Sequence, residues 1–466
     1  MLQRREDDGA RAVADLTARL DRLPATRSVW SLIALLSLAY FFEVYELLLS
    51  GYIAPGLVSS GVLTATTQAI FGMTGLASFI AALFAGLVIG TLSSGFLIDR
   101  FGRRAAFTTA LLGYTACGFV MGFQTGPFGL NLCRFLAGIA LGWEMVTINT
   151  YITELMPRQM RGRAFAFCQM IGFSAVPVVA FLSWALVPHR PLGVDGWRWV
   201  VFIGAGGALF VWYARLRLPE SPRWLIRKGR VAEAVAIVDD LERRVAAEHG
   251  RPLPDPTPVR EDPAEGRFSE MFGPAYRGRT AMLVAFNIFQ TIGYYGFTNW
   301  VPTLLVSHGI AVTEGLLYTV LIALAAPVGP MVGFLLGEGV ERKFIIVGGA
   351  ATIAIAGLLF GATTNAVALV ALGLVMTLAG NMISFAYHAY QTELFPTRFR
   401  AKAVGFVYSF SRISAMLNAF LIAFFLREFG VGGVFAFIAV AYVIVVAVIG
   451  LFGPRTAGRS LEEIAS

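Results

Sequence analysis

The sequence has few of the residues on which most enzyme chemistry depends. Of its 466 residues, 3 are cysteine, 4 are histidine, and Asp, Glu, Lys and Arg together make up 14%. The histidines are scattered and no C-x-x-C or H-E-x-x-H motif occurs, so we expect no metal site. Three cysteines cannot all pair, and Cys117, Cys133 and Cys168 fall in apolar runs as small apolar residues. Without a nucleophile–base set or a phosphate-binding loop, the sequence argues against an enzyme.

Long apolar runs dominate the rest of the chain. Hydrophobic residues make up 57% of the sequence, with 38 phenylalanines and 50 glycines. A soluble protein could not bury so much apolar surface, so the composition predicts a membrane protein. Each of about twelve runs is long enough to span a bilayer as a helix of roughly 20 residues. Six lie on each side of a polar stretch, and the runs are 29–57, 70–98, 105–124, 127–153, 162–187, 197–216, 279–306, 313–337, 344–362, 366–394, 400–426 and 431–453.

The predicted fold class is an all-α membrane protein with about twelve transmembrane helices in two six-helix bundles. Near the N-terminus, Leu16, Leu20 and Leu23 recur at helical spacing. We expect them either along the membrane surface or in a solvated helix. The chain divides into a cytosolic N-terminal arm, an N-terminal bundle, a cytosolic loop with short amphipathic helices, a C-terminal bundle and a cytosolic tail, at 1–28, 29–216, 217–278, 279–453 and 454–466, respectively.

Basic residues indicate the orientation, because cytoplasmic loops of membrane proteins collect Lys and Arg. With both termini inside, the opposite face of the membrane holds only Arg190, Arg198 and Arg427. The net charge of +8 then reflects orientation and contact with anionic headgroups, and no nucleic-acid partner is expected. We expect a monomer in a bacterial-type inner (plasma) membrane, with the lipid bilayer, protons and a small-molecule substrate as its partners.

One charged segment of the apolar region occurs twice. Residues 134–163 read RFLAGIALGWEMVTINTYITELMPRQMRGR, and the exit YITELMP recurs 239 positions later as YQTELFP. Arg134, Gly138 and Gly142 are four apart and share a helix face on which small residues let a neighbouring helix approach. Arg134 and Glu144 each cost several kcal/mol inside a membrane unless they face a cavity or a partner. Both are therefore candidate functional residues.

The first span carries two more acids. Glu43 and Glu46 are one helical turn apart, so they are expected to point to the same side. Because burial and a like charge both disfavour a second negative charge, one of them should hold a proton at neutral pH. We predict that Glu43, Glu46 or Glu144 carries a transported proton. The alternative for Glu46 is a snorkelling or interhelical hydrogen-bonding group.

The end of the second span points to a family. It reads GTLSSGFLIDRFGRR at 90–104, and a related stretch, GEGVERK, begins at 337 but lacks the Gly-Arg step. The pair resembles the signature loop of the major facilitator superfamily, whose two six-helix halves are related by an internal repeat. The stretches LPESPRWL at 218–225 and GPRTAGRSLEE at 453–463 resemble motifs of its sugar-porter and organic-ion branches, with Arg455 in place of the usual Glu.

The resemblance implies a secondary transporter driven by a proton gradient, without a cofactor. It also implies that Asp99 latches the outward-open state by accepting from helix-end amides or arginines of the other bundle. Arg134 occupies the family's fourth-helix arginine position, which is associated with proton coupling or gating. The charged cytoplasmic stretches would lock the inward gate, which makes the candidate gating residues Asp99, Arg100, Arg103, Arg104, Glu154, Arg161, Glu220, Arg223, Glu341, Arg342, Glu393 and Arg400.

The seventh and eleventh spans bear on the substrate. A sugar porter would be expected to carry a glutamine pair in the seventh span, where this chain has one glutamine and an aromatic cluster. Flat rings stack on Tyr and Trp, so a planar guest fits better, although membrane-interface packing is the alternative for these aromatics. Arg412 is a permanent cation that either binds a substrate carboxylate or neutralises Glu43 or Glu144. The candidate substrate-binding residues are Arg412, Tyr45, Gln290, Tyr294, Tyr295, Trp300, Asn381 and Tyr387.

Together these features favour proton-coupled uptake of a small organic anion by alternating access. An aromatic or heterocyclic carboxylate fits best, because niacin-type and organic-anion carriers place an arginine as Arg412 is placed and a G-x-E as at 142–144. The alternatives are a proton antiporter that exports organic cations or drugs, a proton-coupled sugar transporter, and a transporter-like sensor. The charged midplane and the lack of an added signalling domain weigh against the sensor.

Overall fold

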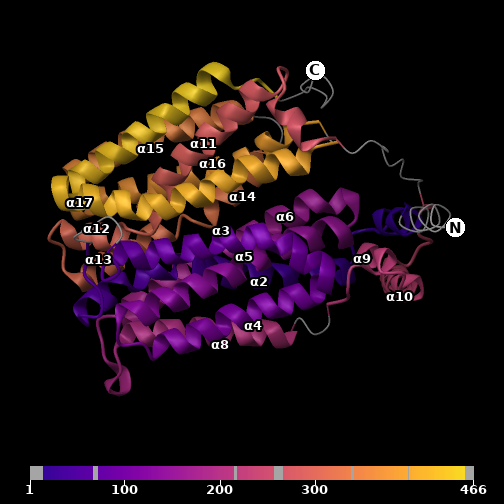
Figure 1. The fold of residues 1–466 in the computed structure, drawn as a ribbon, viewed down its shortest axis with the longest axis horizontal. Coiled ribbons are helices and arrows are strands. Elements are labelled where there is room, and N and C mark those ends of the chain that lie inside the picture. The colour runs from indigo at the N-terminus through magenta and orange to yellow at the C-terminus, as the bar shows by residue number, and fades with distance from the viewer. Residues whose placement is uncertain are drawn as a thin grey trace.

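The computed structural model describes residues 14–66, 72–214, 218–256, 266–336, 341–396 and 398–456. These residues are almost entirely helical, and the only β pairing among them is an isolated bridge between Thr64 and Gly75. The first four residues of GEGVERK and the end of the C-terminal motif, from 457 on, lie outside the described residues. Figure 1 shows the helices as two bundles stacked side by side, with the early part of the chain in one and the late part in the other.

The N-terminal bundle contains six membrane crossings. The fifth crossing consists of two helices that meet at Ser174, which ends the first and begins the second. A short 3-10 turn, η1 (Pro191–Gly193), precedes the sixth crossing. In chain order the helices are α2 (Arg27–Ser59), α3 (Leu76–Phe101), α4 (Arg103–Gly122), α5 (Pro127–Leu155), α6 (Arg158–Phe173) with α7 (Ala175–Leu186), and α8 (Gly196–Ala214).

The C-terminal bundle repeats this pattern. Its last helix, α17, bends back at Gly430 and therefore comprises two crossings. The φ of Gly430 is 64°, a left-handed conformation that favours glycine. The two runs expected at 400–426 and 431–453 are these two halves. The helices are α11 (Arg277–Thr298) with α12 (Val301–Ser307), α13 (Val312–Ala323) with α14 (Val328–Leu336), α15 (Arg342–Ala362), α16 (Ala366–Glu393) and α17 (Arg400–Phe452), preceded by the short η3 (Phe268–Phe272).

Length and composition mark most of these helices as membrane-spanning. In the described part of the chain, nine segments are long and apolar enough to cross a bilayer, with the two halves of α17 counted once. Helices α8 and α11 are not among them, and α11 carries polar residues, including Asn287, Gln290 and Thr291, which are buried in the protein. A helix that faces the protein interior need not be apolar all round. The predicted all-α membrane architecture is confirmed.

Glycines set the closest helix contact of the N-terminal bundle, between α3 and α5. A methyl group added at Gly138 would lie 2.1 Å from the carbonyl oxygen of Leu83, and one added at Gly90 would lie 2.2 Å from that of Ile139. The two backbones therefore touch at these positions, as small residues in membrane helices allow. This is the close approach that the spacing of Gly138 and Gly142 predicts.

A small helical layer covers one end of the N-terminal bundle. It comprises α9 (Pro222–Arg227), α10 (Val231–His249) and a helical turn at 14–21. Arg19 and Arg22 of that turn form ion pairs with Glu242 of α10. Leu16, Leu20 and Leu23 are buried in the protein core at 3–4% exposure, so neither the membrane surface nor a solvated helix describes them.

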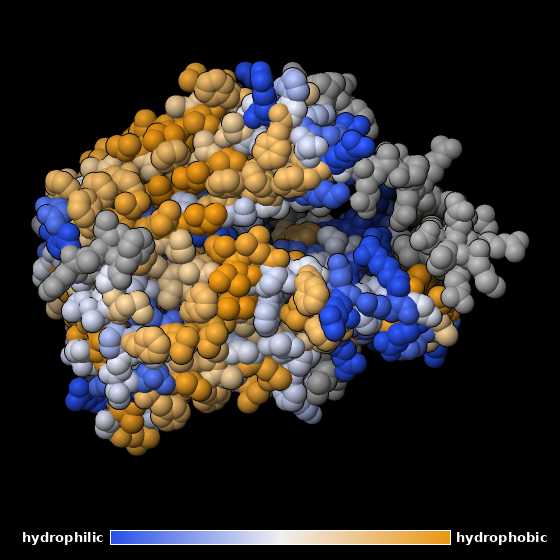
Figure 2. All heavy atoms as spheres, in the orientation of Figure 1, coloured by the Kyte–Doolittle hydropathy of each residue, from blue (hydrophilic) through white to orange (hydrophobic). Residues whose placement is uncertain are grey.

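The two bundles meet tightly at the end opposite this layer. Helix α2 contacts α12, α7 contacts α13, and α3 contacts α17. A methyl group added at Gly51 of α2 would lie 2.2 Å from the carbonyl oxygen of Asn299, between α11 and α12. Figure 2 shows a recess between the bundles on the side of α9 and α10, lined by hydrophilic residues. The structure is thus closed at one end and open toward the layer formed by α9 and α10.

Candidate functional site

Arg412 lies at the centre of the molecule with 3% of its surface exposed. Its guanidinium donates hydrogen bonds to the hydroxyl oxygens of Tyr295 at 3.1 Å and Tyr408 at 2.7 Å, and it contacts Met145 Sδ at 3.1 Å. Its Nε is buried without a partner. No carboxylate of the described residues lies within ion-pair distance of it. The two tyrosines accept from the guanidinium and so keep their own protons to donate.

Aromatic rings surround this cation on the side of the C-terminal bundle. The guanidinium lies 4.7 Å from the centroid of the Tyr408 ring, in cation–π contact. The Tyr387 and Tyr408 rings are nearly parallel, at 27° and 6.4 Å between centroids, and Tyr294 packs edge-on against Tyr295 at 5.1 Å. From the other bundle, Phe84 packs against Tyr295 at 4.8 Å. Arg412, Tyr295 and Tyr387 of the predicted set thus come together around one centre.

Glu43 reaches the same centre from the N-terminal bundle. It is 5% exposed, its Oε2 has no hydrogen-bond partner, and it interacts electrostatically with Arg412. Tyr40, one turn earlier on α2, interacts with Glu43 and with Tyr295 and Tyr408. An acid on one bundle and a cation on the other therefore face each other without forming a direct ion pair.

Glu46 has a different partner from Glu43. Its Oε2 accepts from Arg134 Nη1 at 2.9 Å, and its backbone oxygen accepts from Arg134 Nη2 at 2.7 Å. Both side chains are essentially buried, and the guanidinium also lies 5.5 Å from the centroid of the Phe79 ring. The sequence predicts that Glu43 and Glu46 share one proton because they lie on the same side of the helix. In the structure each acid interacts with its own arginine, Glu43 with Arg412 and Glu46 with Arg134.

Glu144 lies deeper in the N-terminal bundle. It is completely buried and interacts with Tyr114 of α4, which is also buried. The following residue, Met145, is the one that touches Arg412. Glu144 is therefore the sequence neighbour of the residue that contacts Arg412. Tyr114, which interacts with Glu144, also interacts with Glu46.

The remaining predicted substrate residues divide into two groups. Asn381 accepts from the Tyr294 hydroxyl at 3.3 Å, and both line a cavity of about 30 Å³ between the bundles. Gln290 is buried one turn away on α11 and accepts a long contact, 3.5 Å, from Thr291. Tyr45 instead lies between α2 and α8 and donates to the backbone oxygen of Val200 at 2.8 Å.

Trp300 is also placed away from the central cluster. It is 1% exposed at the start of α12, in the hydrophobic core near the closed end. Tyr45 and Trp300 therefore pack in the structure, although their residue types fit a binding role equally well. Three residues of the centre, Tyr408, Met145 and His388, are absent from the predicted set. The sequence could have indicated Tyr408, because it lies one helical turn before Arg412 and shares its face of the helix.

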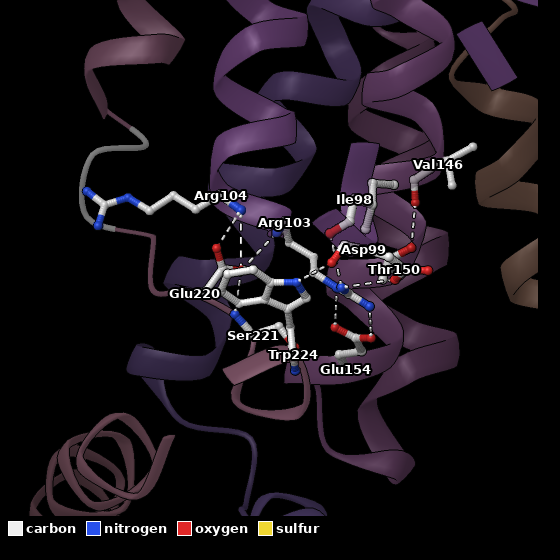
Figure 3. Close-up of polar contacts among 10 residues, drawn as sticks. All are labelled: Ile98, Asp99, Arg103, Arg104, Val146, Thr150, Glu154, Glu220, Ser221 and Trp224. Atoms are coloured by element: carbon white, nitrogen blue, oxygen red, sulfur yellow. Dashed lines mark hydrogen bonds and ion pairs between the residues drawn. The ribbon is translucent and has the colours of Figure 1, made fainter. Parts of the chain in front are cut away.

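The loop between α3 and α4 forms a compact polar network at the end of the bundle that α9 and α10 cover (Figure 3). Arg103 donates to both carboxylate oxygens of Glu154, at 3.0 and 2.9 Å. The Glu220 carboxylate accepts from the backbone N–H groups of Arg103 at 3.0 Å and Arg104 at 3.1 Å. It thereby caps the N-terminus of α4, where the helix dipole favours an anion. Trp224 donates to the backbone oxygen of Asp99 at 3.0 Å.

Asp99 itself makes a weaker contact than the implied latch. Its side chain is 68% exposed and lies 3.5 Å from Arg103 of its own bundle. The implied partners are in the other bundle and belong to an outward-open state, whereas this structure is open toward the layer of α9 and α10. Arg100 packs over the Phe96 and Phe101 rings.

The second half repeats the first at an offset of 239 positions. Arg342 pairs with Glu393 at 2.8 Å as Arg103 pairs with Glu154 at 2.9 Å. The repeat therefore aligns Arg342 with Arg103. Aligning the two loops by sequence instead matches Glu341 with Asp99, which is an offset of 242 positions.

The remaining gating candidates make local contacts. Arg161 and Arg400 each donate from Nε to the backbone oxygen five residues earlier, and Arg161 also pairs with Asp21. Glu341 accepts from the backbone of Thr456 at 2.9 Å, and Arg223 Nε is buried without a hydrogen bond. In the described residues each of these ion pairs joins elements of one bundle, so none of them bridges the opening between the bundles.

Comparisons with known proteins agree with this architecture. The model of the family "Sugar (and other) transporter" matches residues 35–466. The inner membrane metabolite transport protein YdjE of Escherichia coli is 31% identical over 96% of this chain and 98% of its own. The niacin transporter NiaP of Acinetobacter baylyi is 27% identical over 97% and 99%, respectively.

A solved D-xylose–proton symporter superposes with a TM-score of 0.75 at 19% identity. The match covers 93% of this chain and 99% of that chain. At this identity the similarity supports the fold, and it places the twelve crossings in a known arrangement. In the part of the chain that the structure describes, no group of three or more His, Cys, Asp or Glu side chains is placed to hold a metal ion. The chain belongs to the family of sugar and other transporters within the major facilitator superfamily, and it is a membrane transporter of small metabolites rather than an enzyme.

Proposed function

We propose that this protein takes up a small organic anion together with protons, and that Arg412 binds the anion. The observation that carries the proposal is a buried guanidinium with no ion-pair partner among the described residues. A buried charge without a partner is strongly destabilising, so a site that keeps one is suited to a charged ligand. Arg134, the other buried arginine of the membrane region, has its own carboxylate.

The surroundings of Arg412 favour an aromatic or heterocyclic carboxylate. A carboxylate can accept from the guanidinium and from the hydroxyl groups of Tyr295 and Tyr408. A flat ring attached to it would lie beside the Tyr387 and Tyr408 rings, which favour stacking. The niacin transporter among the relatives is consistent with a heterocyclic acid.

Proton coupling would use the acids of the N-terminal bundle. When Glu43 is protonated, Arg412 is free to hold the anion. When the proton leaves toward the cytosol, the Glu43 carboxylate competes for Arg412 and the anion departs. The pair Glu46–Arg134 and the buried Glu144 are the further proton-carrying candidates of the same bundle.

The two bundles would rock about this centre, in an inner membrane with both termini in the cytoplasm and as a monomer. The contact of Gly51 with Asn299 closes the outer end, and the recess in Figure 2 is the inward path. Asp99, Arg103, Glu154, Arg342 and Glu393 lie on the cytosolic side and would make the gate of that path. Each bundle moves as a unit in this scheme.

The test is uptake of labelled nicotinate and benzoate into proteoliposomes with an alkaline interior. We expect wild-type protein to accumulate at least one acid, and Arg412→Leu to lose that uptake while keeping its thermal stability. Arg427→Leu is the matched control, because this arginine is part-exposed and pairs with its neighbour Glu428. Retained uptake by Arg412→Leu would remove the substrate role from Arg412.

Sugar uptake is the second candidate, and the polar groups beside Asn381 favour it. The hydroxyl groups of Thr319, Thr377 and Tyr294 line the small cavity there and suit a polyol better than an anion, and the cavity would have to widen from about 30 Å³ to admit a sugar. Uptake of labelled xylose or arabinose that survives Arg412→Leu would support it. Export of cations coupled to proton entry would instead support the antiporter alternative, in which Glu43 binds the guest.

A further inference from the structure

His388 belongs to the central cluster, and the transport scheme above does not use it. Its imidazole ring packs against Tyr387 with centroids 4.3 Å apart and against Tyr408 at 5.8 Å. Although these rings and the charge of Arg412 surround it, the side chain remains partly exposed. Because the imidazole packs against the same Tyr408 ring as Arg412, a molecule bound beside Arg412 would lie near His388.

The hydrogen bond on one side of the ring defines what the other side can do. His388 Nδ1 lies 2.6 Å from the backbone oxygen of Ser384, one turn earlier on α16. A carbonyl oxygen only accepts hydrogen bonds, so Nδ1 must carry the proton. In the neutral ring, Nε2 then has a lone pair to offer and no proton. Among the described residues no hydrogen bond to this nitrogen is formed.

The position of His388 relative to Arg412 matters as much as its chemistry. Both groups lie against the same ring, with the guanidinium carbon 4.7 Å and the imidazole centroid 5.8 Å from the centre of Tyr408. The Tyr387 ring packs against both His388 and Tyr408. The cluster thus brings charged donors, an acceptor and flat aromatic surface together around the Tyr408 ring.

We propose that His388 is a specificity-determining residue that accepts a hydrogen bond from a donor on the substrate's ring. The preferred substrates are then aromatic carboxylates that also carry a ring hydroxyl, with the carboxylate on Arg412 and the hydroxyl on His388 Nε2. This inference rests on the proposed function and narrows its substrate class. An unsubstituted acid leaves Nε2 unpaired, and an unpaired polar group in a desolvated site weakens binding.

The test compares benzoate with its 3-hydroxy and 4-hydroxy derivatives in proteoliposomes containing the full-length protein. Wild-type protein should take up at least one hydroxybenzoate with a KM roughly tenfold lower than that for benzoate. His388→Phe retains a flat ring but removes the acceptor, so it should raise the hydroxybenzoate KM toward the benzoate value. The KM for benzoate should stay unchanged in the same variant. His388→Gln, whose side-chain oxygen can accept, should restore part of the preference.

Three other results would overturn the inference. Equal KM values for the two kinds of acid in wild-type protein would show that no group reads the hydroxyl. A parallel rise of both KM values in His388→Phe would assign the residue a packing role. If wild-type protein takes up nicotinate but none of these acids, the inference fails and the proposed function stands, whereas uptake of no acid at all overturns both. Thermal melting of both variants controls for misfolding, and the wild-type ratio of KM values is informative without either variant.

Discussion

Two buried arginines of this protein are in opposite electrostatic situations. Arg134 shares its charge with Glu46 in a direct ion pair, and it lies in the N-terminal bundle. Arg412 has tyrosine hydroxyls and a thioether as its neighbours. Because the cost of a buried charge depends on its partner, the first arginine is stabilised by its carboxylate, whereas the second would gain from a bound anion, as the proposed function requires.

The ion pair between Glu46 and Arg134 predicts a specific pattern of stability. Glu46→Gln or Arg134→Met alone leaves one buried charge unpaired and should destabilise the protein by about 3–5 kcal/mol. The double variant removes both charges and should be more stable than either single variant. Thermal unfolding in detergent measures this as a double-mutant cycle. Additive effects of the two substitutions would show that the side chains do not interact.

At the scale of elements, backbone contact between α3 and α5 holds the N-terminal bundle together. Both helices present glycines at the crossing, where any side chain would overlap a carbonyl group of the other helix. In a bilayer, helices associate through such close packing because lipid chains are as apolar as the helix surfaces. Ion pairs as well as apolar contacts hold the layer of α9, α10 and residues 14–21 together.

Two glycines of α3 provide a matched test of that contact. Gly90→Ala would place its methyl group 2.2 Å from the Ile139 carbonyl oxygen, so it should lower the melting temperature by several degrees. Gly95→Ala, on the same helix, meets nothing within 4 Å and should leave the melting temperature unchanged. Equal melting temperatures of the two variants would contradict the close approach.

The attachment of the N-terminal turn to α10 should depend on pH. Burial opposes the charged form of Glu242, but hydrogen bonds from Arg19 and Arg22 outweigh it and lower the pKa of this carboxyl below its ordinary value. A lowered pKa contributes stability above the ordinary value, near 4.3, and loses it as pH falls through the folded-state value. Amide hydrogen exchange of residues 14–22, corrected for its intrinsic pH dependence, should therefore be slow at neutral pH and fast below about pH 4.

Glu242→Gln provides the control for this pH dependence. The neutral amide cannot form the ion pairs, so exchange at residues 14–22 should already be fast at pH 7 in this variant. Protection that is unaffected by Glu242→Gln would mean that the buried leucines alone hold the turn in place.

For the whole molecule, the essential feature is that the two bundles touch at one end and part at the other. One end is sealed by backbone contact between α2 and the start of α12, whereas the ion pairs at the opposite end join elements of the same bundle. Alternating access requires that the sealed contact open and that a contact at the opposite end form. In the proposed function, transport therefore depends on the bundle interface as well as on Arg412.

Gly51 tests this view. In Gly51→Val the added side chain would overlap the backbone of Asn299, so the outer end should not close and uptake should be lost. Binding of the acid should survive, because Gly51 lies outside the Arg412 cluster; thermal shift with added substrate measures it. Gly206→Val, at a glycine of α8 with nothing within 4 Å, is the control and should transport normally. Normal uptake by Gly51→Val would show that this contact does not gate the outer end.

The sequence by itself determined the membrane crossings, the two halves and the presence of Arg412, because hydropathy and charge are local properties. It did not determine which partner each charged residue has. Glu43 and Glu46 are one turn apart, yet Glu46 binds Arg134, 88 positions away, while Glu43 lies in the field of Arg412 from the other bundle. Tyr45 and Trp300 read as binding residues but are packed, and His388 reads as an isolated histidine but lies beside the central cation. Helical periodicity assigns a residue to a face, and only the packing of distant helices decides what that face meets.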